Sequence, residues 1–312
     1  MKPNSLTYFE NHSDCGIGPE TCQALASHAG SLTTLNLAVS DKGLPGLGHL
    51  QPCTSIETLK LTDLRPPHDL KATQNDVFLE IVSWLQQCSR LRDIGLIDFL
   101  SAPAILTPVL EKSNLRLEAL QVNAKENSMY AAKDNQDFHR AISNQTSLTS
   151  LLLTADADGC FGDDMQILCD CVCALKNLRE LKLTRITEYF SDSHVNRIAE
   201  ELFGLEDLFI DGYGISDNCL GKLTNLGNLK TVTFSGLTSF TADGLLEFIN
   251  NLGPGNQGLV MVIDRAIMDS ALSIAEKEIV RDAMAAKVQG RFDYELFGGR
   301  PGNDLLAMMG II

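Results

Sequence analysis

Residues 178–183 read LRELKL, and this pattern, L-x-x-L-x-L, recurs along most of the 312-residue chain. Residues 32–37 read LTTLNL, residues 148–153 read LTSLLL and residues 205–210 read LEDLFI. Further copies begin at residues 56, 91, 117 and 229, with weaker copies at residue 6 and near residue 258. The spacing averages about 28 residues, and a regular period of this size predicts a repeat architecture.

The pattern also predicts the structure of each repeat. Its fourth and sixth positions point to the same side of a β-strand, so each repeat sends two apolar side chains into a core. The residues that follow read as a helix, with Ser191, Ser216 and Thr241 in the position of an N-cap. One repeat cannot bury its apolar face alone, so the repeats must stack. We therefore predict an α/β solenoid of about ten turns, a horseshoe with a parallel sheet on its concave side and helices on its convex side.

The chain divides into two parts on this pattern. Residues 1–265 form the repeat solenoid, and residues 266–312 form a C-terminal cap. Residues 266–288 read as a capping helix, and residues 305–312, LLAMMGII, form an apolar tail. This tail is shorter than the roughly 20 residues needed to cross a membrane. We expect it to pack back onto the solenoid or, failing that, against a partner.

Composition excludes several classes of function. With 25 Lys and Arg against 40 Asp and Glu, the formal charge is −15, which disfavours binding to nucleic acid or to anionic lipid. No signal peptide and no apolar stretch long enough to span a membrane are apparent. Nine cysteines form an odd set without a secretion signal, so we expect reduced thiols. These features predict a soluble cytoplasmic protein, with the nucleus as the second choice of compartment.

The motif CDCVC at residues 169–173 resembles a metal site only superficially. Structural zinc sites usually bring together two Cys-x-x-Cys pairs. Here the spacing is Cys-x-Cys-x-Cys within a helical segment, which places Cys169 and Cys173 on one side and Cys171 on another. Cysteine is readily buried, so we interpret these residues as core. We expect neither a metal nor a cofactor.

Residues 6–264 resemble leucine-rich-repeat proteins of the ribonuclease-inhibitor-like kind. Two stretches, GIGPETCQALASHAGSLTTLNL (residues 16–37) and the later AAKVQGRFDYEL (residues 285–296), are also similar to the repeat region of fungal F-box/leucine-rich-repeat proteins. That resemblance implies repeats that select a substrate and an N-terminal F-box of about forty residues that docks a ubiquitin ligase.

The sequence departs from this family at two points. It starts at the first repeat, with no room for an F-box, so either that module has been removed or the natural protein has lost it. The ninth repeat position, often Asn or Cys, holds Tyr213 and Leu237. If the natural protein has lost that module, a ubiquitin-ligase role is in doubt and the solenoid itself must carry the function.

Side chains at the third, fifth and seventh repeat positions are expected to line the concave face. Acids outnumber bases there by six to two, and large apolar groups lie among them. Such a mixture on one concave surface predicts a binding site. The ligand contacts that we predict are Lys60, Asp93, Ile97, Gln121, Leu152, Lys182, Asp207, Phe209, Asp211 and Tyr213.

Two functions fit this surface. The first is a non-enzymatic recognition module that binds a partner protein on its concave face. The alternative is a freestanding small-molecule-binding or cyclising enzyme of fungal secondary metabolism. An enzyme would use five residues as acid and base groups: Glu180, Lys182, Asp207, Asp211 and Tyr213. An open trough would favour recognition, and a deep closed pocket would favour the enzyme.

Two further expectations concern surfaces beyond the sheet. We interpret the long loops that follow three strands as tolerated surface insertions; if they instead lean over the concave face, His68, Tyr130 and Asp158 would form its rim. An uncapped first repeat would expose apolar surface, so a homodimer through Leu6 and Phe9, or through the apolar tail, is a further expectation.

Overall fold

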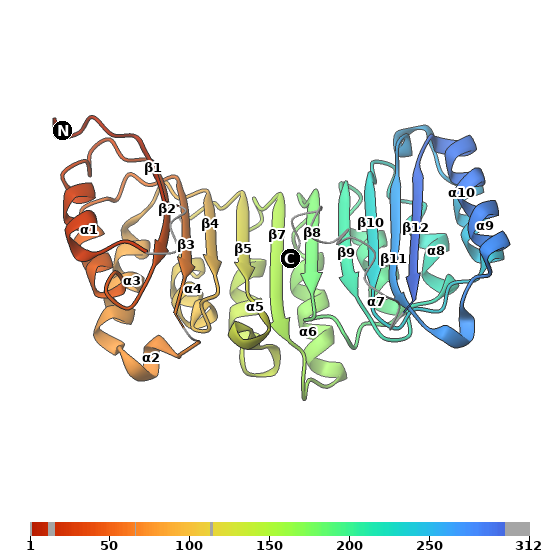
Figure 1. The fold of residues 1–312 in the computed structure, drawn as a ribbon, viewed down its shortest axis with the longest axis horizontal. Coiled ribbons are helices and arrows are strands. Elements are labelled where there is room, and N and C mark those ends of the chain that lie inside the picture. Colours follow the sequence, from red (N-terminus) through yellow and green to blue (C-terminus); the bar gives the residue numbers. More distant parts are fainter. Residues whose placement is uncertain (1, 12–15, 66, 113–114, 297–312) are drawn as a thin grey trace.

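The computed structural model describes residues 2–11, 16–65, 67–112 and 115–296 (Figure 1). In these ranges all strands belong to one parallel arrangement, in which eleven strands follow one another in chain order and the short β6 pairs with β7 beside that path. The strands are β1 (Tyr8–Glu10), β2 (Thr34–Val39), β3 (Thr58–Asp63), β4 (Asp93–Ile97), β5 (Ala119–Asn123), β6 (Tyr130–Ala131), β7 (Ser150–Asp156), β8 (Glu180–Thr184), β9 (Asp207–Asp211), β10 (Thr231–Ser235), β11 (Val260–Ala266) and β12 (Arg291–Leu296).

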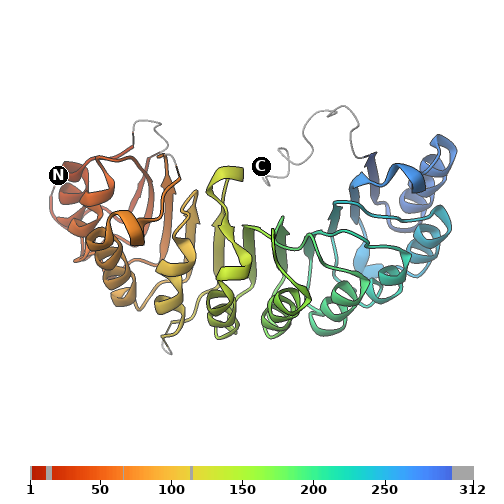
Figure 2. The same ribbon diagram turned by 90° about the horizontal axis from the view of Figure 1, so that it is seen from below.

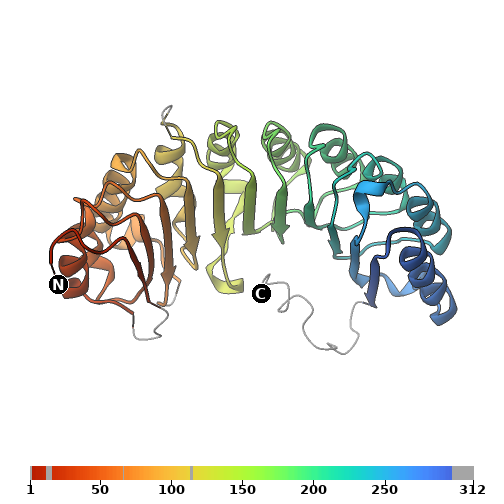
Figure 3. The ribbon, with the colours of Figure 1, turned by 90° about the horizontal axis from the view of Figure 1, so that it is seen from above.

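The sheet curves into an arc, and helices cover its convex side (Figures 2 and 3). The α-helices are α1 (Pro19–Ala26), α2 (Leu70–Thr73), α3 (Asn75–Gln87), α4 (Ala102–Leu110), α5 (Gln136–Ser143), α6 (Gly162–Cys173), α7 (Asp192–Glu201), α8 (Leu220–Leu223), α9 (Ala242–Asn250) and α10 (Ile274–Val288). Short 3-10 helices are η1 (Leu44–Leu50), η2 (Glu126–Ser128), η3 (Ala132–Asp134), η4 (Asp217–Cys219), η5 (Pro254–Asn256) and η6 (Met268–Ser270). This arrangement confirms the predicted α/β leucine-rich-repeat solenoid.

The register explains how the repeat builds the core. Leu35 of β2 lies beside Leu59 of β3, and Leu59 lies beside Ile94 of β4. All three are fully buried between the sheet and the helices. Successive side chains of a strand point to opposite faces of the sheet. The residues before and after each of these three buried residues therefore point to the concave face. The core pattern therefore also fixes which residues can meet a ligand.

The helix starts follow the predicted caps. Thr241 precedes α9, and its hydroxyl accepts a hydrogen bond from the Gly244 N–H at 3.1 Å. Ser191 precedes α7, as expected. Ser216 instead precedes the 3-10 helix η4, which leads directly into α8.

The cysteines occupy the core, as predicted. All eight cysteines in the described ranges are buried and free of disulfides, and Cys15 lies outside those ranges. The Sγ atoms of Cys169 and Cys173 are 4.0 Å apart on one side of α6.

The C-terminal part differs from the predicted cap in two ways. The helix begins at Ile274, because β11 extends to Ala266 and η6 follows it. After the helix, β12 pairs in parallel with β11 and continues the sheet past residue 265. The division of the chain at residue 265 stays a prediction, and the apolar tail at residues 305–312 lies outside the described residues.

None of the helices in the described part of the chain has the length and apolar character needed to cross a lipid bilayer.

Candidate functional site

Three of the predicted residues form an ion cluster at the centre of the concave face. The Lys182 ammonium lies 2.8 Å from Oε1 of Glu180 and 3.2 Å from Oδ2 of Asp207. Strand register explains this grouping, because Glu180 of β8 lies beside Asp207 of β9, and Lys182 is two residues along the same face of β8. The hydroxyl of Ser150, on β7, donates a further hydrogen bond to Glu180 at 2.6 Å. We call Glu180, Lys182 and Asp207 the concave ion cluster.

The protonation of this cluster is set by its internal pairing. Burial disfavours the charge on Glu180, but hydrogen bonds from Lys182 and Ser150 outweigh it and lower the pKa of Glu180. Burial also opposes the charge on Lys182, and its two carboxylate partners outweigh that effect and raise its pKa. Burial raises the pKa of Asp207. At neutral pH Lys182 therefore stays charged and paired with its carboxylates, an arrangement that suits contact with a ligand better than proton transfer.

A second cluster lies at the edge of the sheet where β8 to β11 end. Asp211, the last residue of β9, is 2% exposed, and its Oδ2 accepts a hydrogen bond from the backbone N–H of Arg185. Its Oδ1 is 3.6 Å from the Arg265 guanidinium and has no hydrogen-bond donor among the described residues. Burial raises the pKa of Asp211 to about 6. We call Asp211, Arg185, Arg265 and Glu188 the strand-end cluster.

Both arginines of this cluster have an unusual backbone. Arg185 follows β8 with φ of 62°, and Arg265 lies near the end of β11 with φ of 60°. Residues other than glycine rarely adopt this left-handed backbone conformation. Those that do are found more often at functional sites than elsewhere. The Arg185 side chain reaches Glu126 at 2.9 Å and Glu188 at 3.8 Å. Arg185 and Arg265 are therefore two cations held among carboxylates at this edge of the sheet.

Two exposed tyrosines stand beside the strand-end cluster. The rings of Tyr189 and Tyr213 are 6.4 Å apart and nearly perpendicular, with an angle of 83°. The side chains are 46% and 45% exposed. Burial raises the pKa of Tyr213 and also that of the neighbouring Glu188, whose charge raises the pKa of Tyr213 further. We call Tyr189 and Tyr213 the tyrosine pair.

The other predicted contacts lie on the same face but nearer the N-terminus. Lys60, Gln121 and Leu152 occupy one row across β3, β5 and β7, with Gly95 of β4 between the first two. Burial raises the pKa of Asp93, and the charge of Lys60 opposes that rise. Ile97 is partly exposed at the end of β4. The row continues to Lys182, because Leu152 lies beside it.

Two predicted surface residues are buried, which corrects the sequence-based interpretation. Phe209 was expected as an exposed apolar group, but it is 2% exposed. It lies between Lys182 and Thr233 in the row, and Thr233 and the next residue, Val262, are buried as well. These neighbours pack against one another at strand spacing, so Phe209 belongs to a packed layer. Asp211 was also expected on the surface, but it is 2% exposed, and its carboxylate lies against the Arg185 N–H and the Arg265 guanidinium.

The predicted loop rim is only partly present. Asp158 is exposed and His68 is partly exposed, but Tyr130 is buried at 2%. The Tyr130 hydroxyl hydrogen-bonds to Nε2 of His139 at 3.3 Å, and the Tyr130 ring packs edge-on against Phe138. Tyr130 is therefore a structural residue of the inserted loop.

Leu6 and Phe9 are partly buried and pack against the core. Dimerisation through them stays a prediction.

Sequence reasoning missed Arg185, Glu188 and Tyr189. All three lie in the segment RITEYF that directly follows β8, beyond the third, fifth and seventh repeat positions that were expected to line the concave face. Including the residues of the loop after each strand would have found them, because parallel strands bring the loops that follow them to one edge of the sheet.

Comparisons with known proteins leave the site to be interpreted from its own geometry. No family model matches the chain, and no curated protein matches it significantly. Among solved structures, the crystal structure of the Rad7 and Elc1 complex in yeast is similar over 92% of this chain and 83% of that chain. The identity is 13% and the TM-score is 0.43, values too low to bear on function. The narrower resemblance to fungal F-box proteins stays a prediction from two sequence stretches.

Proposed function

We propose that the chain is a protein-recognition module that binds a partner across its concave face, from the concave ion cluster to the tyrosine pair. The observation that carries this proposal is the exposed tyrosine pair beside the strand-end cluster. Tyrosine is enriched among the residues that dominate binding energy, because its ring buries a large apolar area and its hydroxyl can hydrogen-bond. Two such rings exposed side by side are poorly explained by folding alone.

The charges favour a partner segment that carries Lys or Arg. Glu188 lies beside the pair, and the nearby Asp156 and Asp158 contribute to the raised pKa of Glu188. A cation over a tyrosine ring within about 6 Å is stabilised by the ring electrons, and adjacent carboxylates add to this. The chain's net charge of −15 acts in the same direction over longer distances.

The enzymatic alternative has weaker support in the geometry. Its five candidate residues separate into two groups, and in the first the Lys182 ammonium is already paired with both Glu180 and Asp207. In the second group, Asp211 has a pKa near neutrality, but at 2% exposure it is covered by its neighbours. A general acid or base must reach the substrate directly or through one water.

The proposal can be tested by capture from an extract of cells that produce the protein. Three immobilised forms would be compared by quantitative mass spectrometry: the natural chain, the double variant Tyr189→Ala/Tyr213→Ala, and the control Phe203→Ala. Phe203 is 61% exposed and precedes β9, at the opposite edge of the sheet, so its variant matches the loss of aromatic surface.

We expect proteins that bind the natural chain and the control but not the double variant. The same proteins retained on all three forms would contradict recognition through the tyrosine pair. A small molecule that binds stoichiometrically, with no protein bound, would favour the enzymatic alternative.

A further inference from the structure

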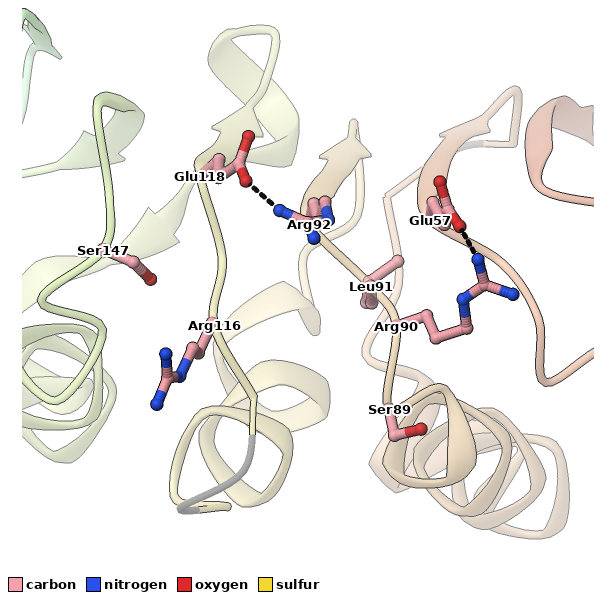
Figure 4. A pocket seen from close by; sticks show the side chains of 8 residues that line it. All are labelled: Glu57, Ser89, Arg90, Leu91, Arg92, Arg116, Glu118 and Ser147. Atoms are coloured by element: carbon pink, nitrogen blue, oxygen red, sulfur yellow. Dashed lines mark hydrogen bonds and ion pairs between the residues drawn. The ribbon is translucent and has the colours of Figure 1, made fainter.

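A polar groove lies at the edge of the sheet where β3, β4, β5 and β7 begin, opposite the edge that carries the tyrosine pair (Figure 4). Its volume is about 520 Å³. Arg90, Arg92 and Arg116 line it together with Glu57 and Glu118. We call it the strand-start groove. Because the chain carries a net charge of −15, a hollow with three arginines and two glutamates locally reverses the charge of the molecule.

Two of the arginines are held in place by acids. Arg90 pairs with Glu57 and Arg92 pairs with Glu118, each through one Nη atom, as Figure 4 shows. A guanidinium has five N–H donors, so both arginines keep donors for a further acceptor. These exposed pairs add little to stability. Their effect is to orient two cations along one wall of the groove.

The third arginine has no such partner. Arg116 is exposed, and no acid pairs with it in the part of the chain that the structure describes. In Figure 4 its side chain extends away from the two ion pairs, toward the side of the groove that carries Ser147. A neighbouring hollow of about 460 Å³ shares Arg116 and Ser147 and adds the amides of Asn144 and Asn177. An unpaired guanidinium among hydroxyl and amide groups suits a carboxylate.

We propose that the strand-start groove binds an acidic segment of a partner protein, with one carboxylate of that segment paired to Arg116. The two hollows together run from the start of β3 to the start of β8, which is four strand spacings or about 19 Å. An extended peptide of about six residues covers this length. The groove shares no residue with the concave ion cluster, the strand-end cluster or the tyrosine pair, so this inference does not rest on the function proposed above.

A direct test uses a fluorescein-labelled peptide of eight glutamates and measures its binding by fluorescence anisotropy. We expect Arg116→Ala to weaken binding by about tenfold or more, as the loss of a charge-assisted hydrogen bond does. The control Lys71→Ala removes the same charge from an exposed position on α2 and should leave binding unchanged. Raising the salt concentration should weaken binding to the natural chain. Thermal unfolding of both variants would show that each remains folded.

Three results would overturn the inference. Equal binding by the natural chain and Arg116→Ala would place the peptide elsewhere. Equal loss in Arg116→Ala and Lys71→Ala would assign the effect to net charge. Failure to bind the glutamate peptide at millimolar concentration would exclude an acidic-peptide site, and binding of a single-stranded oligothymidine instead, sensitive to Arg116→Ala, would identify the groove as a nucleic-acid site.

Discussion

Asp192 accepts two hydrogen bonds from Ser216, one from its backbone N–H at 2.7 Å and one from its hydroxyl at 2.7 Å. One repeat later, Asp217 accepts the same two bonds from Thr241, at 3.0 Å and 2.5 Å. Sequence reasoning placed Ser216 and Thr241 at helix starts but did not foresee this pairing. Each acid therefore joins the helix start of its own repeat to that of the next.

These bonds should contribute measurably to stability. We predict that Asp192→Ala lowers the free energy of unfolding by about 1–3 kcal/mol, because both donors of Ser216 lose a charged acceptor. Urea unfolding would measure the change. Asp243→Ala is the matched control, since it removes an acid from the first turn of α9 at an exposed position. Equal effects of the two substitutions would show that a general helix-start effect explains the result.

The burial of Phe209 leads to a second prediction. Phe209→Ala should lower the free energy of unfolding by about 3 kcal/mol or more, because it opens a cavity in a packed layer. Phe203→Ala, at an exposed phenylalanine, should change it by less than about 0.5 kcal/mol. Denaturant unfolding of both variants tests this. A small effect at Phe209 would mean that this side chain is not packed as described.

The concave ion cluster gives a third prediction. Lys182→Met leaves two neighbouring carboxylates without their cation, so we expect a loss of about 1–3 kcal/mol at pH 7. Adding Glu180→Gln and Asp207→Asn should recover much of that loss, because the unpaired charges are removed. Unfolding free energies of the single and triple variants provide the measurement. No recovery in the triple variant would indicate that Lys182 acts through packing alone.

A fourth prediction concerns pH. The pKa of Asp211 is about 6 in the folded chain against 3.8 for the free side chain, so between these values the folded state binds more protons than the unfolded state. This group therefore makes the fold less stable as pH rises from 4 to 6, by up to about 3 kcal/mol. Asp211→Asn should remove that dependence. The measurable quantity is the difference in unfolding free energy between the natural chain and the variant from pH 4 to pH 7. A difference that stays constant would show that the carboxyl does not titrate in this range.

The sequence was sufficient to predict the sheet and its core. Regular leucines such as Leu181 and Leu208 recur at a fixed period, and their burial requires nothing beyond strand alternation. The concave ion cluster could also be predicted from the sequence, because the strand register alone brings Glu180 and Asp207 together.

Other features depend on contacts that a repeat pattern does not specify. Phe209 has the sequence position of a surface residue, and only its neighbours in the row decide that it is buried. Tyr130 lies in an inserted loop, and its partner His139 comes from α5. The backbone N–H of Arg185 donates to the carboxylate of Asp211, 26 residues further along the chain. Such tertiary contacts determine most of the strand-end cluster.

The first strand, β1, has only three residues and pairs with β2 alone, at three positions. In a stacked repeat each turn contacts only its neighbours, so local opening starts most readily where the contacts are fewest. Backbone amides should therefore exchange with solvent fastest near β1 and more slowly toward β7 and β8. We therefore expect opening to proceed repeat by repeat from this end, and a partner that spans the arc should suppress exchange over several repeats at once.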